Sequence, residues 1–305
     1  MSESKRSKLS IWMQAVRPFA FTASIIPVFI GGALAFAQPY RTSWLLFPLV
    51  LLCALLFHAG TNVISEYFDF KKGLDKTYTS GSSRVLVDGL IGPKEVLIAG
   101  YVLFGTGFLI GLVLVFVRGW MIFTLGIIGL LGGIFYSAKP VGYKYIGLGD
   151  IMVFLMMGPL LVGASYFALT GTFERKVIYV SLPVGFLVTA ILNANNIRDI
   201  KYDREAKVKT LENILGYPAA KKEYFFLVTA AYLSVAVMFF TKILSLWSML
   251  TFLSLPLALK NMAIAKRSQE DKPRAEIIFL DVKTARLHFL FGLLLFISVI
   301  LGKFI

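Results

Sequence analysis

The sequence has little cysteine, few acidic residues and few charges overall. Its single cysteine, Cys53, stands inside an apolar run, so no intramolecular disulfide framework can form. Charged residues make up only 16% of the 305 residues, and the 17 acidic residues are outnumbered by 31 basic ones. Hydrophobic residues reach 57%, whereas soluble domains have roughly 45–50%. This composition indicates an integral membrane protein.

Long apolar runs predict several transmembrane helices, since about 20 apolar residues cross a bilayer. No cleavable signal peptide is evident, and we treat the first run as mature structure. We predict an all-α fold in which two parallel four-helix halves and a ninth helix form one membrane-embedded domain over residues 1–305. The predicted spans are about 19–37, 44–66, 95–117, 119–137, 149–170, 177–197, 223–241, 244–263 and 285–304.

The distribution of basic residues predicts the orientation. With the N-terminus in the cytoplasm, most of the 31 basic residues fall on that side, and the outer side keeps Arg41, Arg118, Arg175, Lys176, Lys242 and Lys303. The positive-inside rule therefore places the N-terminus in the cytoplasm and the C-terminus outside a cell membrane. This topology also explains the net charge of +14, so the lipid bilayer is the expected partner and a nucleic acid is not needed. The sequence makes no prediction about oligomeric state.

Two acidic clusters each end an apolar span. The first contains Asn62, Ser65, Glu66 and Asp69 and continues to Asp75, and the second contains Asn195, Asn196, Arg198, Asp199 and Asp203. Residues three or four apart share a helix face, so each cluster forms one polar stripe. Carboxylates at a helix C-terminus oppose the helix dipole and repel each other unless a cation lies between them. Two facing stripes predict a site for Mg²⁺ and a phosphorylated ligand, and ordinary solvated helix ends are the alternative.

The two clusters end the second and the sixth predicted span, which run in the same direction. Both clusters are therefore expected at the cytoplasmic face, and the four spans between them indicate a parallel repeat. Inverted repeats with a site at the bilayer midplane are typical of transporters. The span centres here are almost free of charge, which argues against a cation-coupled transporter.

Basic residues on the same predicted face could bind phosphate oxygens. Arg84 follows the small residues Ser80-Gly-Ser-Ser, whose backbone N–H groups could also approach an anion. For the other basic residues, topology alone is an equally good explanation; they are Lys72, Lys139, Lys144 and Arg198. Tyr136 and Lys139 resemble interface anchors, with acceptor binding as the alternative.

Three further polar residues are ambiguous. Asp150 is either a helix N-cap or a functional residue. His58 is expected to make an interhelical hydrogen bond, and His288 is expected to be structural as well.

These motifs resemble the UbiA superfamily of intramembrane prenyltransferases, and within it the 1,4-dihydroxy-2-naphthoate prenyltransferases of menaquinone synthesis. The matching stretches begin at Arg17-Pro-Phe-Ala-Phe, Thr61-Asn-Val-Ile-Ser-Glu, Tyr145-Ile-Gly-Leu-Gly-Asp and Asn195-Asn-Ile-Arg-Asp, with Lys209-Thr-Leu after the last. The resemblance implies helices around a central cavity that opens to lipid, and a reaction between a prenyl diphosphate and an aromatic acceptor.

The resemblance also implies roles for individual residues. Asp69, Asp199 and Asp203 would be catalytic and hold Mg²⁺, with Glu66 and Asp75 as further metal ligands. The candidates for substrate binding are Asn62, Ser65, Glu66, Lys72, Arg84, Tyr136, Lys139, Asn195, Asn196 and Arg198.

One residue departs from the family pattern. The family has Asn immediately before the acidic residue of the first motif, and this chain has Ser65. Asn62 stands near enough to substitute in part as an oxygen ligand. The departure keeps other acceptors open, namely 4-hydroxybenzoate, a porphyrinoid alcohol or an ether-lipid precursor, and also a non-catalytic, quinone-binding relative.

Overall fold

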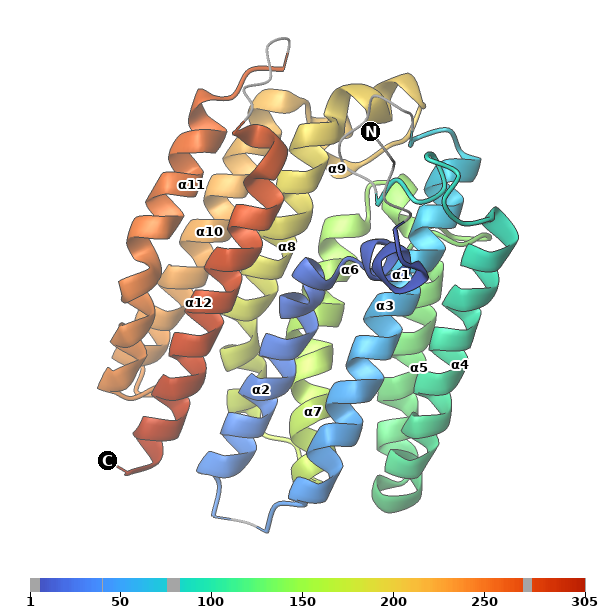
Figure 1. Ribbon diagram of the computed structural model, residues 1–305. Coiled ribbons are helices and arrows are strands. Elements are labelled where there is room, and N and C mark those ends of the chain that lie inside the picture. The colour runs from blue at the N-terminus through green and yellow to red at the C-terminus, as the bar shows by residue number, and fades with distance from the viewer. Residues whose placement is uncertain (1–5, 40, 76–82, 271–275, 305) are drawn as a thin grey trace.

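The computed structural model describes residues 6–39, 41–75, 83–270 and 276–304, and these ranges are mainly helical (Figure 1). The β-structure in them is one isolated bridge between Ile146 and Lys209. The predicted all-α class is therefore confirmed for the described part of the chain. The helices are α1 (Lys8–Val16), α2 (Thr22–Ala37), α3 (Phe47–Lys71), α4 (Pro93–Arg118), α5 (Trp120–Phe135), α6 (Gly149–Leu155), α7 (Leu161–Thr170), α8 (Arg175–Glu205), α9 (Leu211–Leu215), α10 (Tyr217–Phe240), α11 (Leu255–Arg267) and α12 (Leu280–Leu301).

Eight helical segments of the described chain are long and apolar enough to cross a membrane. One of them, Gly149–Thr170, consists of α6 and α7 joined by a π-helical turn at Met156–Leu160. Pro159 lies in this turn and lacks the N–H that an α-helix needs, which explains the widened turn. The one predicted span outside these eight is 119–137, which corresponds to α5, a helix of 16 residues. At 1.5 Å per residue α5 is about 24 Å long, shorter than the ~30 Å hydrocarbon core, so its spanning remains a prediction.

Two helices continue well past the ends that the apolar pattern predicts. The pattern ends one span near residue 66 and another near residue 197, whereas α3 runs to Lys71 and α8 runs to Glu205. The apolar pattern ends before the helix does, because polar residues continue the helical backbone where their side chains face polar neighbours and not lipid. Both acidic clusters are therefore helical for most of their length.

Close approach of small residues holds the centre of the bundle together. A Cβ added at Gly31 of α2 would lie 2.7 Å from the Ser165 Cβ of α7, and one at Gly158 would lie 2.9 Å from the Gly185 Cα of α8. Lipid provides no hydrophobic drive between helices, so such contacts supply packing instead. The contact between Gly158 and Gly185 places the π-helical turn against α8, the helix that carries the second acidic cluster.

Interhelical hydrogen bonds add to this packing. His58 Nδ1 lies 2.8 Å from Ser24 Oγ, which joins α3 to α2, and His288 Nδ1 lies 3.0 Å from Thr22 Oγ1, which joins α12 to α2. The predicted interhelical role of His58 is confirmed. Cys53 is half-buried, and its thiol donates to Gly107 O at 3.3 Å.

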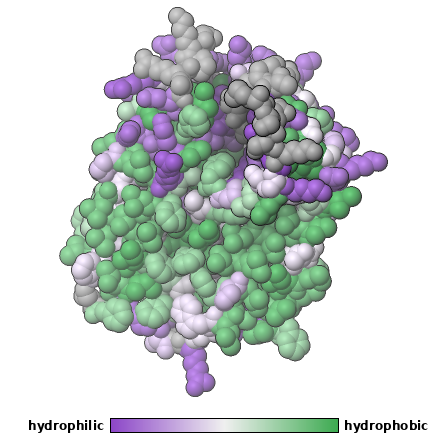
Figure 2. All heavy atoms as spheres, in the orientation of Figure 1, coloured by the Kyte–Doolittle hydropathy of each residue, from purple (hydrophilic) through white to green (hydrophobic). Residues whose placement is uncertain are grey.

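Most polar side chains gather at one end of the bundle, apolar side chains cover the middle of the visible face, and a few polar side chains lie at the opposite end (Figure 2). The C-terminal ends of α3 and α8 both lie at this polar end, and α1 packs against α3 (Figure 1). The chain is a multi-pass membrane protein whose two acidic clusters share one end. The assignment of that end to the cytoplasm remains a prediction from charge.

Cysteine labelling checks this orientation. In a Cys53→Ser background, cysteines placed at Lys94 or Lys222 should react with an impermeant maleimide only from the cytoplasmic side, and cysteines at Arg41 or Arg175 only from outside. All four positions are exposed in the structure. Labelling of Lys94→Cys from outside would contradict the orientation.

Candidate active site

The two acidic clusters meet at a small polar cavity of about 50 Å³ between the ends of α3 and α8. Asp69 and Asp75 come from the first cluster, and Asp199 and Asp203 come from the second. The other residues that line the cavity are Arg17, Leu74, Lys144, Asn195, Asn196 and Tyr202. The structure therefore brings four carboxyl groups from distant parts of the sequence to one cavity.

Asp69 is held by three neighbours that fix its carboxylate. Lys144 Nζ lies 2.6 Å from Oδ2, the Tyr145 hydroxyl donates to Oδ1 at 2.8 Å, and the Ser65 hydroxyl donates to Oδ2 at 3.2 Å. Lys144 also donates to Ser65 Oγ at 3.3 Å. Burial lowers the pKa of Lys144, but the charge of Asp69, together with Tyr136, the hydrogen bond to Asp69 and the charge of Asp203, raises that pKa overall. Lys144 is therefore a permanent cation at the wall of the cavity.

Asp75 is a carboxyl group of the cavity with one buried oxygen that has no partner among the described residues. Burial raises the pKa of Asp75 to about 7, and the charges of Asp69 and Glu66 contribute in the same direction. Its Oδ2 atom is buried and has no hydrogen-bond partner among the described residues. Such an oxygen is suited to a hard cation, which takes oxygen ligands.

Glu66 and Asn62 tie the start of the chain to α3 and do not appear among the residues that line the polar cavity. Glu66 Oε2 accepts from Arg17 Nη2 at 2.7 Å and from Ser83 N at 3.2 Å, and Asn62 Nδ2 donates to Val16 O at 3.0 Å. The stripe that the sequence predicts is thus divided. Asn62 and Glu66 bind residues at the C-terminal end of α1, because α1 packs against this part of α3. Of Asn62, Glu66 and Asp69, only Asp69 lines the polar cavity.

Arg198 also lies differently from the expectation that it binds substrate. Its Nε and Nη2 atoms bind both carboxylate oxygens of Asp199 at 3.0 and 2.7 Å, and its Nη1 atom binds Asp281 Oδ2 at 2.6 Å. Further bonds go to Asn195 Oδ1 and, at 3.4 Å, to Ile278 O. Because a guanidinium has five N–H donors, this arrangement uses all of them. Arg198 acts here as the counter-charge of Asp199.

The other predicted basic and aromatic residues divide into near and distant ones. Tyr136 lines the larger cavity described below, and Lys72 Nζ lies 4.4 Å from the centre of the Tyr145 ring. Lys139 is exposed, and Arg84 forms an ion pair with Asp88 at 2.9 Å. Neither Lys139 nor Arg84 lines the two cavities. Ser80, Gly81 and Ser82, which the anion-binding hypothesis includes, lie outside the described residues.

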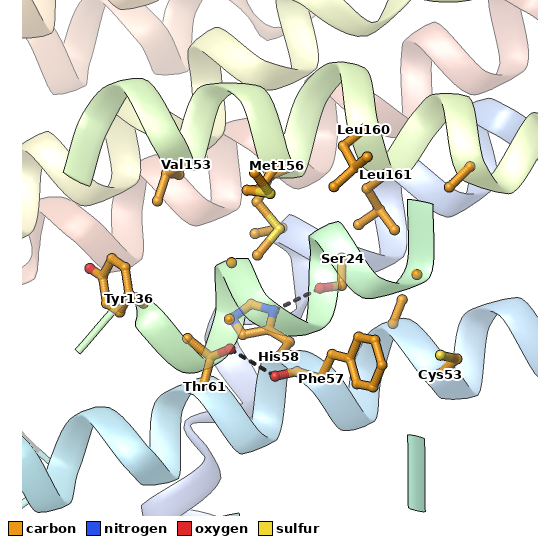
Figure 3. Close-up of a pocket in the computed structure, with 18 of the residues that line it drawn as sticks. Ser24, Cys53, Phe57, His58, Thr61, Tyr136, Val153, Met156, Leu160 and Leu161 are labelled. Atoms are coloured by element: carbon orange, nitrogen blue, oxygen red, sulfur yellow. Dashed lines mark hydrogen bonds between the residues drawn. The ribbon is translucent and has the colours of Figure 1, made fainter. Parts of the chain in front are cut away.

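A large apolar cavity of about 290 Å³ adjoins the polar one, and Arg17, Lys144 and Asn195 line both. Figure 3 shows Val153, Met156, Leu160 and Leu161 on one wall and His58, Thr61 and Phe57 on the other. The Ser24–His58 and Thr61–Phe57 hydrogen bonds satisfy the polar groups within this greasy wall (Figure 3). The combined shape suits an amphiphile with an anionic head and a long apolar tail.

The donor set of the polar cavity fits Mg²⁺, although the carboxylates are not gathered around one point. No three acidic, histidine or cysteine side chains of the described chain are close enough to bind one metal ion together. Lys144 and Arg198 explain this spacing, because each holds one aspartate as its counter-ion. Oxygen donors alone, with the buried unpartnered oxygen of Asp75 among them, are what Mg²⁺ prefers.

Comparison with known proteins decides the family. The model of the UbiA prenyltransferase family matches residues 24–302. The chain belongs to this family. It is 31% identical to the 1,4-dihydroxy-2-naphthoate octaprenyltransferase of Bacillus subtilis, over 98% of this chain and 95% of the relative. It is 30% identical to UbiA prenyltransferase domain-containing protein 1 of Danio rerio, over 97% of this chain and 86% of the relative.

Solved structures of the UbiA family share the fold. The structure of a UbiA homolog from Archaeoglobus fulgidus bound to GPP and Mg²⁺ superposes with a TM-score of 0.65 at 18% identity, and covers 95% of this chain and 99% of that one. A UbiA homolog from Aeropyrum pernix gives a TM-score of 0.66 at 14% identity, over 90% of this chain and 96% of that one.

Several residues that line the cavities or contact the cavity aspartates were not singled out by the sequence analysis as site residues. Tyr145 and Arg17 appear in the sequence only within stretches of family resemblance, and Asp281 carries no motif at all. Asp281 stands 83 positions after Arg198 in the sequence, so its contact with Arg198 depends on the packing of α12 against α8. No local signal could have found it.

A second group of carboxyl groups lies where α8 contacts α6 and α9. Glu212 of α9 is fully buried, and its oxygens accept from Asn193 Nδ2 at 3.1 Å and from Asn196 Nδ2 at 2.9 Å. Burial and the charge of Asp150 raise the pKa of Glu212 to about 9, and Glu223 adds to the effect. Glu212 is therefore protonated at neutral pH. Asp150 belongs to this group, and the N-cap hypothesis for it is wrong because Leu148 is the N-cap of α6.

The raised pKa of Glu212 makes stability depend on pH. A carboxyl group whose folded-state pKa lies above its unfolded value stabilises the fold fully below the unfolded pKa of 4.5, and this contribution is lost as pH rises through about 9. Glu212→Gln keeps one of the two acceptor oxygens, removes the titrating proton and should flatten this fall in melting temperature. Glu270→Gln, which alters a partly exposed carboxylate paired with Arg204, is the matched control and should leave the slope unchanged. An equally steep slope in Glu212→Gln would contradict the assignment.

Proposed function

We propose that this protein transfers a prenyl group from a prenyl diphosphate to an aromatic acceptor, with Mg²⁺ as the cofactor. The acceptor we propose is 1,4-dihydroxy-2-naphthoate, which makes the reaction a step of menaquinone biosynthesis. The observation that carries the proposal is the junction of the two cavities. Four carboxyl groups and two cations meet there at the mouth of a large apolar space.

The polar cavity supports a role in binding the diphosphate. Asp69, Asp75, Asp199 and Asp203 would hold Mg²⁺, which when bound neutralises charge on the leaving diphosphate. Arg17 and Lys144 line both cavities, so their cationic groups stand where an anionic head would join its tail. The Nε atom of Arg17 is buried and has no partner among the described residues, and it is available to a phosphate oxygen.

The apolar cavity supports a role in holding the tail and excluding water. Breaking the allylic C–O bond leaves a carbocation-like prenyl group, which water would quench. The wall of leucine, methionine and phenylalanine side chains keeps this region dry, while an electron-rich ring bound beside Tyr136 can attack the prenyl carbon. Holding both reactants in one cavity supplies the orientation that a two-substrate reaction needs.

The relatives support both the donor and the acceptor of the proposal. The Archaeoglobus homolog has been solved with GPP and Mg²⁺ bound, and also with DMAPP and Mg²⁺ bound. The Bacillus relative is named for 1,4-dihydroxy-2-naphthoate. Because the Danio relative is almost equally similar, 4-hydroxybenzoate, a porphyrinoid alcohol and an ether-lipid precursor remain the alternative acceptors to test.

A cation-coupled transporter is the competing function from another class. Transport calls for ionisable groups near the bilayer midplane. The carboxylates of this chain lie at the ends of α3 and α8, at the polar end of the bundle (Figure 1). This position favours an enzyme whose site opens to the cytoplasmic side, in the orientation that the charge distribution predicts.

Variants of the cavity aspartates test the role of Mg²⁺. Turnover of a labelled prenyl diphosphate in membranes should require Mg²⁺ or Mn²⁺ and stop with EDTA. Asp69→Asn, Asp199→Asn and Asp203→Asn should each lower the rate by about 100-fold or more, because each removes a charge that holds the metal. Asp88→Asn, at an exposed carboxylate outside both cavities, is the control. Near-normal turnover in two of the three variants would contradict the assignment.

A panel of acceptors tests the second substrate. Purified protein with a labelled prenyl diphosphate and Mg²⁺ should prenylate 1,4-dihydroxy-2-naphthoate faster than 4-hydroxybenzoate or a glycerol phosphate ether. The ratio of kcat/KM values is the measurement. Preference for another acceptor would overturn the naphthoate and keep the transferase, whereas donor binding without transfer to any acceptor would favour the non-catalytic alternative.

A further inference from the structure

We propose that Asp281 is a positioning residue of the donor site, because it shares the Arg198 guanidinium with Asp199 and thereby makes it easier for a divalent cation to displace Arg198 from Asp199. This inference rests on the proposed function of the cavity. It concerns a residue of α12 that belongs to neither acidic cluster.

The three side chains form a buried chain of charges. The side chains of Arg198, Asp199 and Asp281 are 6%, 20% and 9% exposed, so Arg198 and Asp281 are nearly withdrawn from water. Arg198 is bidentate to Asp199 and bound to Asp281 at 2.6 Å on its other side. One positive charge therefore compensates two negative charges.

This sharing has a consequence for cation binding. A cation that takes the Asp199 oxygens has to displace the Arg198 Nε and Nη2 donors. The displaced guanidinium would be a buried, poorly compensated charge if Asp199 were its only anion, which is costly. Asp281 keeps a carboxylate on the guanidinium, so the displacement leaves Arg198 paired.

The position of Asp281 allows this role. It stands in the first turn of α12, where a carboxylate is favoured by the helix dipole, and its Oδ1 atom accepts from Val282 N at 2.8 Å. It also lines the large cavity, as Asn195 does. Asp281 is thus fixed by its own helix and does not depend on Arg198 for its place.

Magnesium-dependent binding of a donor analogue tests the proposal without turnover. The probe is geranyl thiolodiphosphate, whose binding is followed by the shift in melting temperature while MgCl₂ is titrated. Asp281→Asn leaves the whole Arg198 charge to Asp199, so the Mg²⁺ concentration for half-maximal binding should rise about tenfold. Asp281→Glu should restore a value within about threefold of the wild type, since it keeps the charge. Glu270→Gln removes one negative charge from an exposed pair and should change nothing.

A double variant keeps the test decisive if Asp281→Asn fails to fold. Arg198→Gln with Asp281→Asn removes Asp281 together with its cation and leaves Asp199, 20% exposed, as the one carboxylate of the three, and its half-saturating Mg²⁺ concentration should match that of Arg198→Gln alone. An unchanged Mg²⁺ dependence in Asp281→Asn, or an equal rise in Glu270→Gln, overturns the role of Asp281. A persisting difference between the double variant and Arg198→Gln overturns it as well. Failure of the wild type to bind the analogue in a Mg²⁺-dependent way would instead overturn the proposed function itself.

Discussion

The compensation of buried carboxylates by a few cations is the constraint on which the rest of this site depends. An unpaired charge removed from water costs several kcal/mol, so a cation stabilises an ionised carboxylate at the ends of α3 and α8, and three of these carboxylates have one. Glu66 has Arg17, Asp69 has Lys144 and Asp199 has Arg198. Each cation comes from a different place in the chain. Charge pairing therefore fixes the start of the chain, the Tyr143–Tyr145 turn and α12 around one polar cavity.

Lys144 and Arg198 are the counter-ions of Asp69 and Asp199. Under the proposed function, a diphosphate with its metal would bring both an anion for the basic groups and a cation for the carboxylates, so the pairs could exchange partners without leaving a charge buried alone. The ion pairs would then position the charged side chains before the ligand binds, and the strength of each pair would determine how easily the ligand displaces it.

The sequence predicts much of this arrangement because its strongest signals are local. Spacings of three and four residues placed Asp199 and Asp203 on one face, and the direction of the spans placed both clusters at one end. The partner of each side chain depends instead on tertiary packing. Glu66 pairs with Arg17 because α1 packs against α3, and Arg198 pairs with Asp281 because α12 packs against α8. The sequence gives no reason to prefer Lys144 over Lys139. In the structure Lys144 lies in the Tyr143–Tyr145 turn and binds Asp69, whereas Lys139 is exposed.

The departure at Ser65 belongs to the same network of contacts. Its hydroxyl donates to Asp69 and accepts from Lys144 and from Ser137 Oγ, the last at 3.0 Å, while the residue is only 5% exposed. A longer amide side chain at this buried position would compete for the space that the Lys144 ammonium occupies. The short hydroxyl instead lets the lysine reach Asp69 directly, at 2.6 Å. The small side chain and the close Lys144–Asp69 pair are therefore two parts of one local arrangement beside the apolar cavity, which Ser65 and Lys144 both line.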